Sequence, residues 1–374
     1  MYNITVVGAG KIGVTIAGLL GGTGDYAVTL LDASAAALAR VKLGPHMVAR
    51  QLDVQEPGAL RAALTGQFAV LSAAPFHLTT PIAEAAVAAG VHYLDLTEDV
   101  ASTRRVRALA ETARASLIPQ CGLAPGFVSI VAAELCRRFD TLHSVRLRVG
   151  ALPQFPSNAL NYNLTWSTDG VINQYCEPCE AIVDGALHEV QALAACEEFS
   201  LDGVRYEAFN TSGGLGTLGE TLLGRVAHLN YKSIRYPGHA AIMNVLLHDL
   251  RLRERRAVFK DILEHALPTT LQDVVIVFVT VTGQRDGRLD QETYAHKVYS
   301  QPVDGVQRSA IQLTTASSIC AVLDLLAAGR LPVRGFVKQE DIALTDFLAN
   351  RFGQAFAGQS SIPVDASKNQ FPRT

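Results

Sequence analysis

The sequence predicts an α/β protein built from a doubly wound parallel sheet and an inserted α+β second domain with a mixed sheet. A glycine-rich turn follows an apolar run near residue 1, and strand-like and helix-like stretches then alternate as far as residue 122. Beyond that point, alternating apolar and polar residues and Asp-Gly turns are typical of antiparallel strands. We therefore divide the chain into a doubly wound domain (1–123), the inserted domain (124–309), C-terminal helices returning to the first domain (310–356) and a loose tail (357–374).

The glycine-rich turn follows the β-branched run 4–7 and precedes a stretch with helical spacing. In such a Rossmann-type turn, Gly8 allows the tight bend, Gly10 lets the backbone approach a pyrophosphate, and Gly13 lets the helix pack closely on the strand. Free N–H groups at the helix N-terminus then face the phosphates. The residues expected at the pyrophosphate are Gly8, Gly10, Lys11, Ile12 and Gly13.

A second predicted strand, 28–31, ends in Asp32, nineteen residues after Gly13. A carboxylate there can accept both ribose hydroxyls of an adenosine and would repel a 2′-phosphate. Ala33 and Ser34 follow, so no arginine stands next to Asp32 to receive that phosphate. The sequence therefore predicts NAD as the cofactor.

A second match to the glycine pattern, Gly214-x-Gly216-x-x-Gly219, provides an internal control. It follows the polar stretch 210–213 rather than an apolar run. We therefore expect a loop that no strand precedes and that binds no dinucleotide.

Further strand and helix patterns complete the first domain. Apolar strands are predicted at 48–52, 69–74, 91–96 and 116–121, and helices at 35–42, 57–64, 81–89 and 101–115. Thr80 and Pro81 predict the N-cap and first position of the third of these helices. Asp53 follows a strand, where it would touch the adenine or lie on the surface. The other residues expected at the cofactor are Ala74, Pro75 and Leu123, at the sheet edge where the nicotinamide of such folds lies.

The pattern changes after a predicted helix at 127–138. The stretch 144–149 alternates strictly, which predicts a half-exposed strand, and Asp184-Gly185 predicts a hairpin turn. A second hairpin is predicted around 283–287, and helices are predicted at 240–251, 256–265, 310–328 and 341–352.

Composition limits the function classes. The net charge of −3 and the scattered basic residues exclude an extended nucleic-acid surface. No segment shows the length and apolarity expected of a transmembrane helix, and a strand begins almost at residue 1, so we expect a cytoplasmic protein that binds no membrane. Of the six cysteines, Cys176 and Cys179 form a CxxC pair without a second pair at zinc-site spacing, which favours structural thiols and no metal.

Four stretches together carry a family resemblance: Gly-Leu-Ala-Pro-Gly at 122–126, Tyr-Asn-Leu-Thr-Trp-Ser at 162–167, Tyr-Glu-Ala-Phe-Asn-Thr-Ser-Gly-Gly at 206–214 and Tyr-Lys-Ser-Ile-Arg-Tyr-Pro-Gly-His at 231–239. Over residues 1 to about 345 the chain resembles the saccharopine dehydrogenase-like superfamily, and it is most similar to lysine 6-dehydrogenase. Glutamate-forming saccharopine dehydrogenases carry aspartate in the Leu-x-Pro-Gly turn, where this chain has Ala124, as the lysine dehydrogenases do.

The resemblance implies that NAD oxidises the ε-carbon of L-lysine to allysine, which cyclises to piperideine-6-carboxylate, with release of ammonia. Hydride can leave a carbon bonded to nitrogen only from a neutral amine, so a proton acceptor is needed. The candidate acceptors are His239, Tyr162, His77 and Asp95. His239 is predicted at a helix N-terminus, where the dipole keeps the imidazole neutral, although a lone histidine is more often a hydrogen-bonded structural residue.

The same stretches supply candidate substrate ligands. Arg235 suits a carboxylate by geometry and permanent charge, although it could instead hold two segments together as an ion pair. Glu207 could pair with the α-ammonium or be structural, and Trp166 with Tyr162 could line the lysine methylenes or pack in the core. Ser212 and Gly213 are expected in a loop whose N–H groups approach the substrate or the nicotinamide.

Two other functions stay open. An opine-type reductase, of the saccharopine or carboxynorspermidine kind, would run related chemistry in reverse and would need a second carboxylate clamp, for which Arg146, Arg148 and Arg225 are candidates. A non-catalytic NAD-binding sensor is the third possibility. By analogy, a homodimer or higher homo-oligomer is expected through the antiparallel sheet of the second domain.

Overall fold

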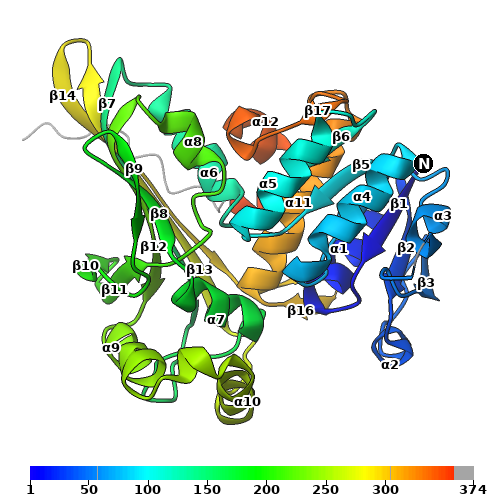
Figure 1. The fold of residues 1–374 in the computed structure, drawn as a ribbon, viewed down its shortest axis with the longest axis horizontal. Helices are drawn as coiled ribbons and strands as arrows, with labels where there is room; N and C mark the ends of the chain where they lie inside the picture. The colour runs from blue at the N-terminus through cyan, green and yellow to red at the C-terminus, as the bar shows by residue number, and fades with distance from the viewer. Residues whose placement is uncertain (57, 304, 358–374) are drawn as a thin grey trace, which may run out of the picture.

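In this computed structural model, residues 1–56, 58–303 and 305–357 are described, and they form two large sheets with helices around and between them (Figure 1). The predicted tail at 358–374 and Pro57, the predicted first residue of a helix, lie outside the described residues. The first sheet has seven parallel strands in the order β17-β6-β5-β4-β1-β2-β3. Its strands are β1 (Tyr2–Val7), β2 (Tyr26–Asp32), β3 (Met47–Gln51), β4 (Ala69–Ser72), β5 (His92–Asp95), β6 (Ser116–Ile118) and β17 (Gly335–Phe336).

Helices cover both faces of this sheet because its central strands are apolar on both faces. In β1, Val6 belongs to the core that contains α1 and α11, whereas Val7 belongs to a second core formed with α3, α4 and α5. The helices of this half are α1 (Lys11–Gly21), α2 (Ala35–Ala39), α3 (Ala59–Ala63), α4 (Thr79–Ala89), α5 (Val100–Ala110), α11 (Ala310–Ala327) and α12 (Leu344–Ala349). This is the doubly wound Rossmann arrangement that the sequence predicts.

The second sheet is mixed. Its main path runs β10-β11-β12-β7-β13-β14, with β8 pairing beside β12 and β9 beside β8, and only the β7–β12 pair is parallel. The strands are β7 (Thr141–Pro153), β8 (Cys179–Val183), β9 (Ala186–Val190), β10 (Glu197–Leu201), β11 (Val204–Asn210), β12 (Val226–Arg235), β13 (Asp273–Arg285) and β14 (Arg288–Tyr299). A small separate ribbon pairs β15 (Gln301–Val303) with β16 (Val306–Arg308).

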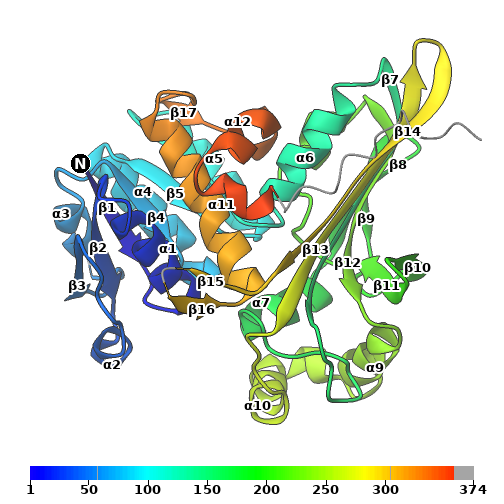
Figure 2. The same cartoon turned by 180° about the vertical axis from the view of Figure 1, so that it is seen from behind.

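Further helices flank or join the two sheets. They are α6 (Phe127–Cys136), α7 (Thr168–Cys176), α8 (Leu218–Leu222), α9 (His239–Asn244) and α10 (Arg256–Ala266). Helices α6 and α11 lie between the two sheets in both views (Figures 1 and 2), and both pack on β13. One hydrophobic core consequently extends from β1 through these helices to β7 and β13.

Helix α11 corrects one expectation, since by length and composition it could cross a membrane. Its apolar residues are instead buried in the core between the sheets, where it packs on α1 and β13. The helix therefore serves here as a core element.

Several local predictions were wrong. Helix α4 begins at Thr79 after a 3-10 turn at Phe76–Leu78, so Thr80 and Pro81 lie inside its first turn rather than at its cap. Strand β7 is buried at Arg148 as well as at its apolar positions, so its alternation does not produce a half-exposed strand. The predicted helix at 341–352 divides into a 3-10 turn at Gln339–Asp341, then α12, then a 3-10 turn at Gly353–Phe356.

The two predicted hairpins were correct. Asp184 and Gly185 connect β8 to β9, and Asp286 and Gly287 connect β13 to β14. All four residues have positive φ, which Asp-Gly turns accommodate at low cost.

Candidate active site

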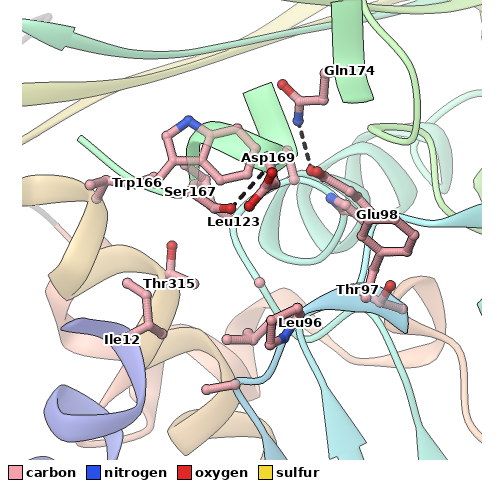
Figure 3. A pocket seen from close by; sticks show the side chains of 18 of the residues that line it. Ile12, Leu96, Thr97, Glu98, Leu123, Trp166, Ser167, Asp169, Gln174 and Thr315 are labelled. Atoms are coloured by element: carbon pink, nitrogen blue, oxygen red, sulfur yellow. Dashed lines mark hydrogen bonds between the residues drawn. The ribbon is translucent and has the colours of Figure 1, made fainter. Parts of the chain in front are cut away.

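A cleft of about 610 Å³ lies between the carboxyl edge of the first sheet and the second sheet (Figure 3). The residues that line it on the side of the first sheet include Ile12, Ala74, Pro75, His77, Asp95, Leu96, Glu98 and Leu123. Those on the other side include Trp166, Asp169, Gly170, Gln174, Tyr231, Ser233, Arg235 and Lys260. Carboxyl ends of parallel strands are where ligands bind in this architecture.

The N-terminal glycine turn has the geometry of a pyrophosphate cradle. Gly8 has φ of +105°, and a Cβ there would meet the Ala73 carbonyl oxygen at 2.7 Å. A Cβ on Gly13 would lie 1.8 Å from the Gly8 oxygen, so both positions require glycine. No atom lies within 4 Å of a Cβ position on Gly10, which leaves that side open for a ligand. The turn therefore fits the dinucleotide that the sequence predicts.

Asp32 lies beside this turn at the end of β2. Its Oδ2 accepts the Ala9 N–H at 2.7 Å, and its Oδ1 accepts the Ser34 N–H at 2.8 Å. The carboxylate is thus held at the position where the adenosine ribose is expected. Asp53 is exposed and accepts the N–H of Gln55, and it does not line the cleft.

Arg235, the last residue of β12, reaches the cleft as a buried cation. It is 4% exposed, its Nε donates to the Tyr175 hydroxyl at 3.0 Å, and its Nη1 donates to the Ile234 carbonyl at 2.8 Å. Among the residues that the structure describes, no carboxylate forms an ion pair with this guanidinium, and no acceptor is bonded to Nη2. The alternative of a structural ion pair is therefore wrong for the described chain.

His239 does not line the cleft, which corrects its predicted place beside the substrate. The ring is 1% exposed, with Nδ1 2.9 Å from the Leu160 carbonyl oxygen and Nε2 3.0 Å from the Tyr175 hydroxyl. Burial, together with the charge of Arg235, lowers the pKa of His239 to about 3. Both ring nitrogens are occupied, so the imidazole has no free nitrogen for a substrate proton.

Tyr162 is also outside the lining of the cleft. Its ring lies under Arg235, with the guanidinium carbon 5.0 Å from the ring centroid, and contacts His239 edge-on. The hydroxyl is buried and has no hydrogen-bond partner within the described residues. Tyr162 thus supports the Arg235 guanidinium rather than facing the cleft as predicted.

Glu207 has a structural place instead of the predicted one beside the α-ammonium. Its Oε2 accepts the Gly238 N–H at 2.8 Å and its Oε1 accepts the Ala240 N–H at 2.6 Å, at the start of α9. The carboxylate thereby satisfies N–H groups that the helix leaves unpaired.

Ser212 and Gly213 were predicted to approach the substrate, but neither lines the cleft. The Ser212 hydroxyl donates to the Pro178 carbonyl at 2.7 Å, and its N–H donates to the Gln174 carbonyl at 3.0 Å. Gly213 has φ of +85° and packs against the Glu98 backbone, where a Cβ would meet the carbonyl oxygen at 2.5 Å. The loop supports the wall of the cleft from behind.

The second glycine pattern follows a strand and runs into a helix, contrary to the prediction that no strand precedes it; Gly214 and Gly216 lie in the connecting loop, and Gly219 is in the helix. Strand β11 ends at Asn210 and α8 begins at Leu218. A Cβ on Gly214 would meet the Tyr231 ring at 2.2 Å, so this glycine makes room for an aromatic side chain of the cleft.

Trp166 and Asp95 line the cleft as the sequence suggests. The Trp166 ring packs on Gly170, where a Cβ would lie 2.3 Å from a ring carbon. Asp95 accepts the N–H groups of Thr97 and Gln120 and the hydroxyl of Tyr93, and burial raises its pKa to about 6.

Sequence reasoning missed Glu98 and three other residues that line the cleft, namely Asp169, Gln174 and Lys260. Glu98 Oε2 accepts Gln174 Nε2–H at 2.7 Å, and burial raises the pKa of Glu98 to about 8 (Figure 3). Asp169 and Lys260 pair at 2.6 Å on the same cleft, with both side chains partly exposed. Glu98 was recognisable in principle, because it stands three residues after Asp95, beyond the carboxyl end of a predicted strand.

The three arginines considered for a second clamp do not line the cleft. Arg148 is buried in an ion pair with Glu197, and its Nη1 donates to Asn230 Oδ1 at 2.7 Å. Arg146 and Arg225 are exposed.

Cys176 and Cys179 are buried free thiols, and the described ranges hold no group of three or more His, Cys, Asp or Glu residues that could bind a metal.

Comparison with known proteins identifies the family. Residues 4–118 match the saccharopine dehydrogenase NADP-binding domain, and residues 122–357 match the saccharopine dehydrogenase C-terminal domain. The apo glutamate-forming saccharopine dehydrogenase of Saccharomyces cerevisiae has a similar fold, with a TM-score of 0.78 at 15% identity over 93% of this chain and 97% of the yeast chain. The homospermidine synthase of Legionella pneumophila, solved with NAD, gives a TM-score of 0.65 at 12% identity over 96% of this chain and 90% of its own. The chain therefore belongs to the saccharopine dehydrogenase family and is an oxidoreductase that uses a nicotinamide dinucleotide.

Proposed function

We propose that this protein catalyses NAD-dependent oxidative deamination of the ε-amino group of L-lysine. Lysine, NAD⁺ and water would give allysine, ammonium, NADH and one proton, and allysine would cyclise to piperideine-6-carboxylate. The observation that carries the proposal is Arg235, a buried guanidinium on the same cleft as the predicted nicotinamide edge, with no carboxylate partner among the described residues.

A buried cation is costly unless a counter-charge compensates for its lost hydration. A guanidinium binds a carboxylate in a planar, charge-assisted geometry, and the Nη2 of Arg235 is the donor left for a ligand. We therefore assign the substrate α-carboxylate to Arg235. The apolar lining from Ile12, Leu123 and Trp166 suits the lysine methylenes between that carboxylate and the nicotinamide edge.

The Gly8–Gly10–Gly13 turn and Asp32 would hold the dinucleotide, whose nicotinamide when bound accepts a hydride from the carbon next to nitrogen. The Asp32 carboxylate favours NAD because it would repel a 2′-phosphate. The protein has to place the ε-carbon against the edge formed by Ala74, Pro75 and Leu123, and it has to accept one proton from the ammonium.

An opine-type dehydrogenase is the alternative, and the Lys260–Asp169 pair on the cleft is the observation that favours it. Lys260 could receive a second carboxylate if Asp169 moved. The larger substrate saccharopine carries three carboxylates, whereas Arg235 is the single arginine among the described lining residues. Lysine has a single carboxylate, so one arginine is enough to bind it.

The test is a spectrophotometric screen for NADH formation at alkaline pH. L-lysine, cadaverine, 6-aminohexanoate and saccharopine would be compared, with ammonia, glutamate and 2-oxoglutarate assayed as products. Lysine turnover with stoichiometric ammonia supports the proposal. NADH from saccharopine, with either glutamate or 2-oxoglutarate as the second product and without lysine turnover, would establish the alternative. NAD binding without turnover of any amine would indicate a sensor.

A further inference from the structure

The geometry points to Glu98 as the group that takes the proton from the substrate amine. This inference rests on the proposed function and names a catalytic residue for it. None of the candidate acceptors suggested by the sequence has the same placement. His239 is enclosed, Tyr162 lies outside the cleft, and Asp95 already accepts three hydrogen bonds. His77 lines the cleft, but it is exposed on the 3-10 turn before α4, whereas Glu98 is held between the two halves.

The position of Glu98 is fixed from both halves of the protein. It follows β5 in the first domain, and its Oε2 accepts Gln174 Nε2–H at 2.7 Å from α7 of the second domain. The residue before α5 is Asp99, whose own carboxylate caps that helix by accepting the Ser102 N–H at 2.7 Å. Glu98 is therefore held at the junction of the halves and is not needed as a helix cap.

One oxygen of Glu98 is available to a ligand. Oε1 has no hydrogen-bond partner among residues 1–56, 58–303 and 305–357, and it lies 3.1 Å from where a Cβ would stand on Gly170. Glycine at position 170 thus leaves space beside this oxygen, and Figure 3 shows Glu98 and Gln174 pointing toward each other in the pocket. The substrate amine would donate to Oε1 while Gln174 holds Oε2.

The groups around Glu98 raise the pKa of its carboxyl, so that it can gain and lose a proton at alkaline pH. Burial raises its pKa, the Gln174 hydrogen bond lowers it, and the charge of Asp99 raises it further, to a value of about 8. The other charged or titratable groups on its side of the cleft or facing it are Tyr231, Asp95, His77, Arg235 and the Asp169–Lys260 pair. Above pH 8 the carboxylate is free to accept a proton, and below it the group is already neutral.

The step is a proton transfer. An N–H bond of the ε-ammonium breaks, an O–H bond forms on Glu98 Oε1, and the nitrogen keeps the electron pair as a neutral amine. Glu98 later releases this proton to solvent, which accounts for the one proton produced in each turnover.

The test compares wild-type protein with Glu98→Gln and Gln174→Met. In Glu98→Gln we expect kcat for lysine to fall by about 10²- to 10⁴-fold. The wild-type pH–rate profile should show an acid limb, a fall in rate below about pH 8, and this limb should disappear in the variant. In Gln174→Met the carboxylate loses a hydrogen bond that favours its charged form, so the limb should move to higher pH. Glu84→Gln, an exposed glutamate on α4 paired with Arg105 at 2.9 Å, is the matched control and should keep the wild-type profile.

A second readout needs no turnover. Difference infrared spectra of wild type and Glu98→Gln should show one protonated carboxyl that titrates near pH 8 in the free protein. If this infrared band is absent, or if Glu98→Gln oxidises lysine with an unchanged acid limb, the role of Glu98 is overturned while the proposed function stands. A wild-type protein that shows this band but oxidises no amine would overturn the proposed function and, with it, the role of Glu98.

Discussion

The Tyr175 hydroxyl connects Arg235 to His239, because it lies 3.0 Å from Arg235 Nε and 3.0 Å from His239 Nε2. The carbonyl of Leu160 can only accept, so His239 Nδ1 carries the ring proton and Nε2 accepts the Tyr175 O–H. The tyrosine oxygen then accepts the Arg235 Nε–H. This chain of hydrogen bonds holds the guanidinium at Nε and leaves Nη2 without a partner among the described residues, so His239 acts on Arg235 through Tyr175.

Arg235→Ala should weaken lysine binding with a smaller effect on turnover. Loss of a buried ion pair to the substrate carboxylate costs about 2–5 kcal/mol, which would appear mainly as a raised KM. Steady-state kinetics with lysine and with cadaverine, which lacks the carboxylate, measure the effect. An equal loss with both amines would show that Arg235 does not bind the carboxylate.

His239→Gln should change the acid stability of the protein. The pKa of His239 is about 3 in the folded protein and near 6.5 when unfolded, so the unfolded chain binds the extra proton between these values. This group therefore contributes stability above pH 6.5 that is lost as the pH falls toward 3, by up to about 1.4 kcal/mol per pH unit.

Urea unfolding at pH 7.5 and pH 5 measures that change. The wild type should lose more stability between the two pH values than His239→Gln does. The acid limb of lysine turnover near pH 8 should remain in this variant. If the acid limb is lost in His239→Gln, then His239 and not Glu98 accepts the substrate proton.

The first sheet was predictable because its signals are local. A β-branched run, a glycine turn and an acidic residue at the next strand end specify strand, turn and helix within a few dozen residues. Gly8 and Gly13 make the tight turn and the close helix–strand approach that were predicted, and Asp32 lies at the end of β2. Helix ends were less predictable. Helix α4 begins at Thr79, directly after a 3-10 turn, and it has no side-chain cap, so the N-cap signal at Thr80 did not mark its start.

The site was only partly predictable because function here depends on contacts between distant segments. Arg235 was found from its motif, but Glu207 in the same set of motifs caps α9, a role set by the pairing of β11 with β12. The role of Glu98 depends on Gln174, which is distant in sequence. The homodimer and the cytoplasmic location stay predictions.

Asp32→Ala should relax the choice between NAD and NADP. The carboxylate faces the expected ribose position and would repel a 2′-phosphate, so its removal should weaken NAD binding and improve NADP binding relative to it. Fluorescence titration with NADH and NADPH measures both affinities. If the wild type uses NAD and NADP with equal efficiency, Asp32 does not set the preference.

The two glycine patterns should respond differently to a single methyl group. Gly13→Ala would place a Cβ 1.8 Å from the Gly8 oxygen inside the pyrophosphate cradle, so NADH binding should be lost or greatly weakened. Gly214→Ala would place a Cβ 2.2 Å from the Tyr231 ring, at a distance from that cradle along the chain. Overpacking of this kind costs about 1–3 kcal/mol, so we expect a lower melting temperature and a raised KM for lysine with NADH affinity unchanged. Calorimetry, NADH titration and lysine kinetics on both variants separate these effects. Loss of NADH affinity in Gly214→Ala at a temperature where the protein stays folded would show that the second pattern also contacts the dinucleotide.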